Sequence, residues 1–142
     1  MVTMQNNLQE FVSALAGRLK VDVATLYRLS HDRQSLRLAA SHGLHETAVG
    51  YTMPVTQGIT GRVARTGKVV SLKHPELDPD YHLVPGSGEE QFKTYFGIPI
   101  ARDRVVRGVL VLQTREPHMY LMPDLSAIHE TGLLIERALR AA

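Results

Sequence analysis

The sequence predicts an α+β fold in which a central antiparallel β-sheet carries the two terminal helices on one face and a short helix plus a long loop on the other. Apolar residues recur at helical spacing near both ends of the chain, and short β-branched runs lie between them. The run Val109–Leu112 is apolar throughout, which is typical of a strand covered on both faces. At 142 residues, the chain is expected to form a single domain over residues 1–142.

The amino-terminal part of the chain predicts one long helix followed by a hairpin. Apolar side chains within residues 5–20 fall on one helical face because they recur every three or four positions. They are Leu8, Phe11, Val12, Leu15, Ala16 and Leu19. Two apolar-rich runs, Val23–Ser30 and Leu36–Ser41, are separated by a short polar segment. This arrangement predicts two antiparallel strands.

A short helix, a brief strand and a long loop are expected next. The helix begins at Gly58 with Thr56 as its cap and ends at Gly67, since glycine readily adopts the left-handed conformation that closes a helix. Residues Val69–Leu72 then form a brief strand. Residues 73–91 contain three prolines and two glycines, which indicates a long loop or a set of broken helical turns. Loops of this length inside a compact domain tend to be functional.

The most specific pattern is a hairpin in the second half of the chain. Two apolar, β-branched-rich runs, Tyr95–Ala101 and Val105–Gln113, flank the polar segment Arg102–Arg104, which predicts antiparallel strands in the middle of the sheet. A final helix is expected from Asp124 to Ala141. A cover made of a short helix and a loop packs less completely than one made of long helices, so we expect any cavity beneath that cover.

The composition excludes several classes of protein. Cysteine is absent, which removes disulfides, thiolate metal sites and cysteine nucleophiles. The sequence has no signal-peptide pattern and no window approaching the ~20 apolar residues of a membrane span, so we expect a soluble, cytoplasmic protein without membrane contact. Sixteen Lys and Arg residues are interleaved with fourteen acidic residues, for a net charge of +2. Nucleic-acid binding is therefore not expected.

Catalytic and metal-binding patterns are weak. Gly58 and Gly61 lack the spacing and the lysine of a phosphate-binding loop, and the start of a helix explains them better. The segment His74–His82 carries donor atoms at alternate positions, but its prolines prevent a rigid pair of ligands, so a solvated loop is favoured over a metal site. A capping box from Ser87 to Glu90 explains the adjacent glutamates better than an acid–base pair does. We expect no metal, no cofactor and no enzymatic activity from this chain alone.

Several motifs together resemble the GAF family of sensory domains. Phe-Gly-Ile-Pro-Ile at residues 96–100 is followed by a tight turn, and Gly-Val-Leu-Val-Leu at residues 108–112 is closed by the polar Gln113. The resemblance covers nearly the whole chain. It is closest to the amino-terminal GAF domain of the nitrogen-branch phosphoenolpyruvate-protein phosphotransferases, which share His-Pro, here residues 74–75, and Gly-Glu-Glu, here residues 88–90.

The resemblance also narrows the possible ligands. GAF domains that bind cyclic nucleotides carry an Asn-Lys pair after the last strand, and this chain has Gln113 and Thr114 there. The lysine-to-aspartate bridge that this pattern implies cannot form with threonine, so cyclic nucleotides are disfavoured. GAF domains that attach bilins or reduce free methionine sulfoxide work through cysteine, which this chain lacks.

The resemblance implies a regulatory domain that senses a small carboxylate, such as an amino acid or a 2-oxoacid, and forms the regulatory head of a phosphotransferase. The candidate ligand-binding residues are Thr60, Arg62, Lys73, His74, Tyr81, His82, Tyr95 and Gln113. For Tyr95, filling of the core is an equally good explanation. The alternative function is a ligand-free module for dimerisation. Both terminal helices carry broad apolar stripes, and the resemblance implies a homodimer that pairs through them.

Overall fold

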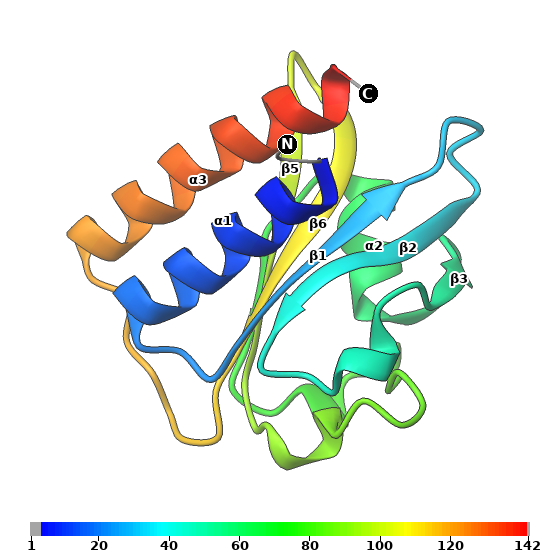
Figure 1. Cartoon of the computed structure of the whole chain (residues 1–142). Coiled ribbons are helices and arrows are strands. Elements are labelled where there is room, and N and C mark those ends of the chain that lie inside the picture. Colours follow the sequence, from blue (N-terminus) through cyan, green and yellow to red (C-terminus); the bar gives the residue numbers. More distant parts are fainter. Residues whose placement is uncertain (1–3, 142) are drawn as a thin grey trace.

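A computed structural model, which describes residues 4–141, confirms the α+β architecture (Figure 1). Its helices and strands are α1 (Met4–Leu19), β1 (Val23–Leu29), β2 (Ser35–His42), β3 (Thr52–Pro54), α2 (Gly58–Thr66), β4 (Val70–Leu72), β5 (Tyr95–Arg102), β6 (Val105–Gln113) and α3 (Met122–Arg140). Short 3-10 turns cover Glu46–Ala48, Pro75–Leu77 and Glu89–Gln91. The six strands form one antiparallel sheet in the order β3-β2-β1-β6-β5-β4.

The predicted hairpin of β5 and β6 lies inside the sheet. Strand β6 pairs with β5 on one side and with β1 on the other. Its side chains alternate between the two faces, because Leu110 and Leu112 belong to one buried cluster whereas Val109 and Val111 belong to another. The continuous apolar run therefore reflects a strand that is covered on both faces, as expected.

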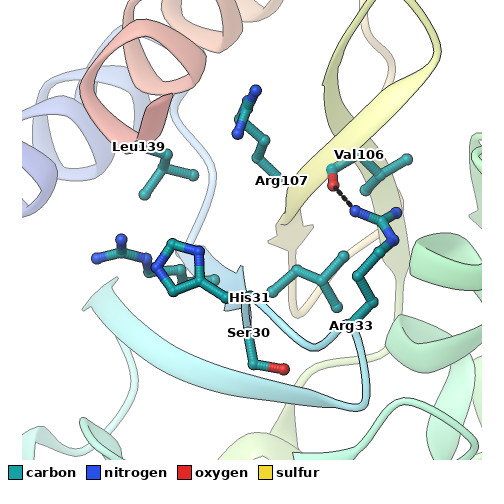
Figure 2. A pocket seen from close by; sticks show the side chains of 8 residues that line it. Ser30, His31, Arg33, Val106, Arg107 and Leu139 are labelled. Carbon is teal, nitrogen blue, oxygen red and sulfur yellow. Dashed lines mark hydrogen bonds between the residues drawn. The ribbon is translucent and has the colours of Figure 1, made fainter. Parts of the chain in front are cut away.

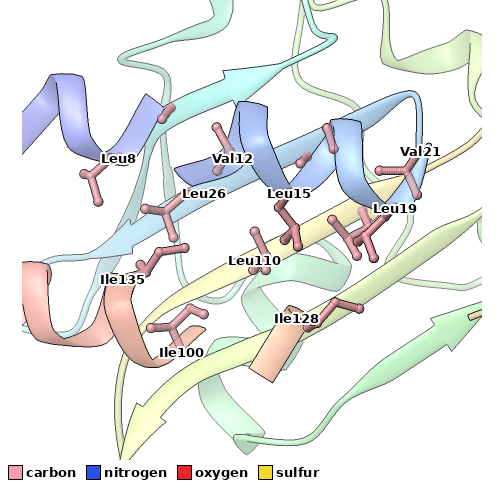
Figure 3. Close-up of a cluster of buried hydrophobic side chains, with 14 of the residues drawn as sticks. Leu8, Val12, Leu15, Leu19, Val21, Leu26, Ile100, Leu110, Ile128 and Ile135 are labelled. Atoms are coloured by element: carbon pink, nitrogen blue, oxygen red, sulfur yellow. The ribbon is translucent and has the colours of Figure 1, made fainter. Parts of the chain in front are cut away.

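Helices α1 and α3 lie side by side on one face of the sheet, and α2 lies on the other (Figure 1). Between the sheet and the two long helices is a cluster of buried apolar side chains, of which Figure 3 shows the centre. Its largest members include Leu8, Val12, Leu15, Leu26, Ile100, Leu110, Ile128 and Ile135. The second cluster lies beneath α2 and the connection from β4 to β5, which we call the 73–94 connection.

The local expectations for the α2 region are only partly confirmed. Gly67 ends α2 in the left-handed conformation, with φ of 67°, as predicted. The predicted cap at Thr56 is wrong, because Gln57 occupies the capping position and its side chain makes no capping hydrogen bond. Strand β3 was not predicted, since a three-residue strand that ends in proline gives little periodicity.

Candidate functional site

Several polar side chains are buried between the sheet and the cover formed by α2 and the 73–94 connection, and four of them form two hydrogen-bonded pairs. These four are Thr60, Glu89, Tyr95 and Gln113, each at most 7 % exposed, and we call them the buried polar layer. The hydroxyl groups of Thr60 on α2 and Tyr95 on β5 are 2.8 Å apart and hydrogen-bonded. Burial raises the pKa of Tyr95 well above its usual value, so the phenol stays neutral.

Glu89 and Gln113 form the second pair of this layer. The Glu89 carboxylate accepts hydrogen bonds from the Val84 backbone N–H, at 2.9 Å, and from the Gln113 side-chain amide, at 3.0 Å. Burial raises the pKa of Glu89, although both hydrogen bonds oppose this shift. Within the described residues, the side-chain oxygen Oε1 of Gln113 is buried and accepts no hydrogen bond. The layer therefore contains an acceptor that lacks a donor, which is uncommon in a protein interior.

Arg62 joins α2 to the 73–94 connection. Its guanidinium donates to both carboxylate oxygens of Asp78, at 2.9 and 2.8 Å, and to Asp80 at 2.8 Å. This bidentate contact is the geometry in which arginine binds carboxylates most strongly. The hydrogen bonds from Arg62 outweigh the effect of burial and hold the pKa of Asp78 below its usual value. We call this contact the Arg62–Asp78 latch.

The lowered pKa of Asp78 predicts that acid opens the latch. A depressed carboxyl pKa stabilises the fold above the pKa of the unfolded state, and this stabilisation disappears as the pH falls through the folded-state pKa. The Asp80 backbone N–H donates to Asp78 Oδ1 at 2.9 Å. The chemical shift of the Asp78 carboxyl carbon reports the titration of Asp78 itself by NMR. We expect a midpoint below ~3.9, the usual value for aspartate, and no such transition in Asp78→Asn. A midpoint at or above the usual value would contradict the strength assigned to the latch.

Two further candidates lie on the 73–94 connection. His82 contacts the hydroxyl of Tyr51 at 3.1 Å and the side-chain amide of Gln57 at 3.0 Å, which fixes the connection against the segment before α2. Tyr81 is on the surface, although partial burial still raises its pKa. Neither residue is among those that hydrogen-bond within the buried polar layer.

The remaining two candidates, Lys73 and His74, lie elsewhere, at a cavity of about 380 Å³ that we call the edge cavity. Its walls come from residues 71–74 at the end of β4, 93–96 at the start of β5, and 115–120 before α3. Tyr95 is the only candidate that belongs both to this cavity and to the buried polar layer. The structure therefore spreads the candidate residues over the buried polar layer, the Arg62–Asp78 latch, the 73–94 connection and the edge cavity, whereas the sequence suggested a single hollow beneath the cover.

Sequence reasoning missed the role of Glu89. The predicted capping box from Ser87 to Glu90 is wrong, because Gly88 takes the capping position of the 3-10 turn with φ of 79°. The Ser87 hydroxyl instead donates to the Val84 carbonyl and accepts from the Glu89 N–H. The turn directs Glu89 inward and leaves Glu90 exposed. The Gly-Glu-Glu motif marked this position but not which of its two carboxylates is buried.

Figure 2 shows a smaller cavity, of about 90 Å³, at the opposite end of the sheet. Two of the three arginines that line it donate hydrogen bonds to oxygen atoms within the fold. Arg33 donates to the Val106 carbonyl at 3.0 Å, and Arg107 donates to the buried Glu136 at 3.0 Å. In residues 4–141 no three His, Asp or Glu side chains gather in a way that could hold a metal ion. No helix within the same residues is long and apolar enough to span a membrane.

Comparisons with known proteins agree on one family. The model of the GAF domain family matches residues 3–140. The phosphoenolpyruvate-dependent phosphotransferase system protein of Escherichia coli K12 is 31% identical over 98 residues, which cover 68% of this chain and 13% of that protein. The Nif-specific regulatory protein of Azospirillum lipoferum is 33% identical over 113 residues, which cover 77% of this chain and 18% of that protein. This chain thus spans less than a fifth of either relative.

Among solved structures, a GAF domain from an Acinetobacter phosphoenolpyruvate-protein phosphotransferase is similar over 99% of this chain and 84% of that chain, with a TM-score of 0.85 and 25% identity. A free methionine-R-sulfoxide reductase from Neisseria meningitidis also shares the fold, with a TM-score of 0.77 over 99% of this chain and 80% of that chain. At 18% identity, this second likeness concerns the fold alone.

Proposed function

The chain belongs to the GAF domain family, and from this premise we propose that it is the metabolite-sensing regulatory head of a phosphoenolpyruvate-protein phosphotransferase. The similarity to the Escherichia coli protein and to the Acinetobacter GAF domain supports this context. Its ligand is a small carboxylate, with an amino acid favoured over a 2-oxoacid, and it binds at the buried polar layer beneath α2.

The observation that carries this proposal is the unpaired acceptor of Gln113 beside the buried carboxylate of Glu89. Burying polar groups without partners costs free energy, so such groups are rare unless a ligand uses them. Two oxygen acceptors, one of them charged, suit a ligand that brings N–H donors. The ammonium group of an amino acid supplies several, whereas a 2-oxoacid supplies none.

In this proposal, Arg62 binds the carboxylate group of the amino acid. The Arg62 guanidinium binds the Asp78 carboxylate through two hydrogen bonds, and a ligand carboxylate has the same planar geometry. Exchange of one carboxylate for the other releases the 73–94 connection from α2. Ligand binding is thereby coupled to movement of the cover, which is the kind of change that a neighbouring domain can sense.

A thermal-shift panel of amino acids, their matching 2-oxoacids and nucleotides tests this function. A ligand at about 100 times its dissociation constant adds about 2.7 kcal/mol of stability, which raises the melting temperature of a domain of this size by several degrees. We expect at least one amino acid to do so, and its oxoacid to do so less. A flat response to the whole panel would contradict metabolite sensing.

A second candidate function, dimerisation, rests on exposed apolar side chains along α3 and just before it. They are Leu121, Met122, Leu125, Leu133 and Leu134, which are between 38% and 72% exposed. Exposed apolar patches of this kind mark protein–protein contacts. We expect sedimentation equilibrium to give a dimer for the wild type and a monomer for Leu133→Glu. A monomeric wild type would remove this candidate without affecting the sensor proposal.

A further inference from the structure

We propose that the edge cavity is a second binding site, which takes an organic anion with an apolar body. It goes beyond the sensor proposal because it uses neither Glu89 nor Gln113. The cavity has a volume of about 380 Å³, within the range of small-molecule sites. It lies at the β4–β5 margin, where the two ends of the 73–94 connection line it, and no residue of α2 is among its lining residues.

The edge cavity and the buried polar layer meet at strand β5. Phe96 and Tyr120, which line the cavity, pack against the apolar cluster beneath α1 and α3. The neighbouring Tyr95 belongs to the other cluster, and its hydroxyl is bonded to Thr60 on α2. A ligand in the edge cavity therefore contacts side chains from both sides of the sheet edge, and among the lining residues Tyr95 is the one that also belongs to the buried polar layer.

The cavity walls carry an excess of permanent positive charge. Lys73, Lys93 and Arg115 line it, with Glu116 as the only acidic side chain among the lining residues. Within residues 4–141, none of these three cations takes part in an ion pair. Positive groups that converge on one cavity without carboxylate partners favour an anion there.

Arg115 is already held in place. Its guanidinium donates to the Gln91 side-chain oxygen at 2.7 Å and lies 5.4 Å from the centre of the Phe92 ring. Its backbone N–H donates to Asp22 at 2.8 Å. Little side-chain entropy remains to be lost when a ligand binds, which favours affinity.

The cavity also offers an apolar surface to the body of a ligand. The rings of Phe96 and Tyr120 lie with centroids 4.8 Å apart, and His118 lies at the same distance from Tyr120. Within the described residues, the Tyr120 hydroxyl is buried and makes no hydrogen bond. An anion that extends to this hydroxyl would provide the missing acceptor. Cations beside aromatic rings together favour an anion with an apolar body over inorganic phosphate.

Carboxylates and phosphates both satisfy this chemistry, so the test includes both. Phenylacetate, phenyl phosphate, 2-phenylethanol and inorganic phosphate are each titrated into the full chain, and amide shifts are followed by NMR. We expect phenylacetate, phenyl phosphate or both to bind and to perturb Thr94, Phe96 and His118, and whichever binds identifies the acidic group. Equal binding of 2-phenylethanol, or binding of none of the four, would overturn the proposal.

Charge variants test whether the side chains that line the edge cavity bind the anion. Lys73→Ala should weaken binding of the better aromatic anion about three- to tenfold, and Glu116→Gln should strengthen it about twofold because the only opposing charge is removed. Lys68→Ala removes the same charge from an exposed site outside the cavity and should have no effect. Equal weakening by Lys68→Ala and Lys73→Ala would overturn the proposal, since it would indicate general electrostatic attraction.

Two variants distinguish the edge cavity from the buried polar layer, because each should affect only one of the two sites. Gln113→Leu should leave the affinity for the aromatic anion unchanged, and Lys73→Ala should leave the amino-acid response unchanged. If Gln113→Leu instead removed binding of the aromatic anion while the protein stayed folded, the edge cavity would not be an independent site.

Discussion

Replacing Leu110 with alanine should lower the free energy of unfolding by about 3 to 4 kcal/mol. Leu110 is fully buried on β6, between Leu26 of β1 and Ile98 of β5, and packs in the cluster beneath α1 and α3 (Figure 3). This decrease in stability has two contributions: the transfer free energy of the deleted methyl groups, and the cost of the cavity that they leave behind. Urea unfolding measures it as a lower midpoint with an unchanged slope.

Val105→Ala is the matched control, because Val105 begins the same strand but is 43% exposed. Val105→Ala should lower the free energy of unfolding by less than about 1 kcal/mol, as other substitutions at exposed strand positions do. Equal losses for the two variants would mean that β6 is not covered on both faces, and the assigned architecture would then fail.

Gln113→Leu should weaken amino-acid binding at least about tenfold, because a ligand N–H group would then face a methyl group in place of an acceptor. The substitution conserves side-chain size and leaves the chain's buried pairs intact except for the contact with Glu89. Isothermal titration calorimetry with the amino acid that most raises the melting temperature measures the change.

Gln91→Leu is the control for this variant, since it removes the same amide from an exposed position two residues after Glu89. It should leave amino-acid affinity unchanged. A thermal melt confirms that each variant is folded before it is titrated. Unchanged affinity in a folded Gln113→Leu variant would exclude the buried polar layer as the ligand site.

The fold could be predicted from the sequence because its main elements carry strong local periodicity. The stripe from Leu8 to Leu19 has the period of a helix, and the run from Val109 to Leu112 can be buried only if both faces of its strand are covered. Strand β3 has neither signal, since it is three residues long and pairs only at the sheet margin. Its position depends on β2 and not on its own sequence.

The candidate site was less predictable because its contacts join residues far apart in the chain. Arg62 was expected to hold a carboxylate, but nothing in the sequence indicated that Asp78, sixteen positions later, supplies one. Glu89 and Gln113 meet only because the 3-10 turn at Glu89–Gln91 packs against the end of β6. Lys73 and His74 follow β4 directly, so the direction of that edge strand places them at the edge cavity.

Amide chemical-shift mapping with the amino acid that most stabilises the protein tests the central claim most directly. The account predicts that the largest shifts fall on Thr60, Glu89, Tyr95 and Gln113, with further changes along the 73–94 connection as Arg62 exchanges partners. Shifts confined to residues 115–120 or to α3, or no shifts at saturating amino acid, would contradict the claim that the buried polar layer binds the regulatory ligand.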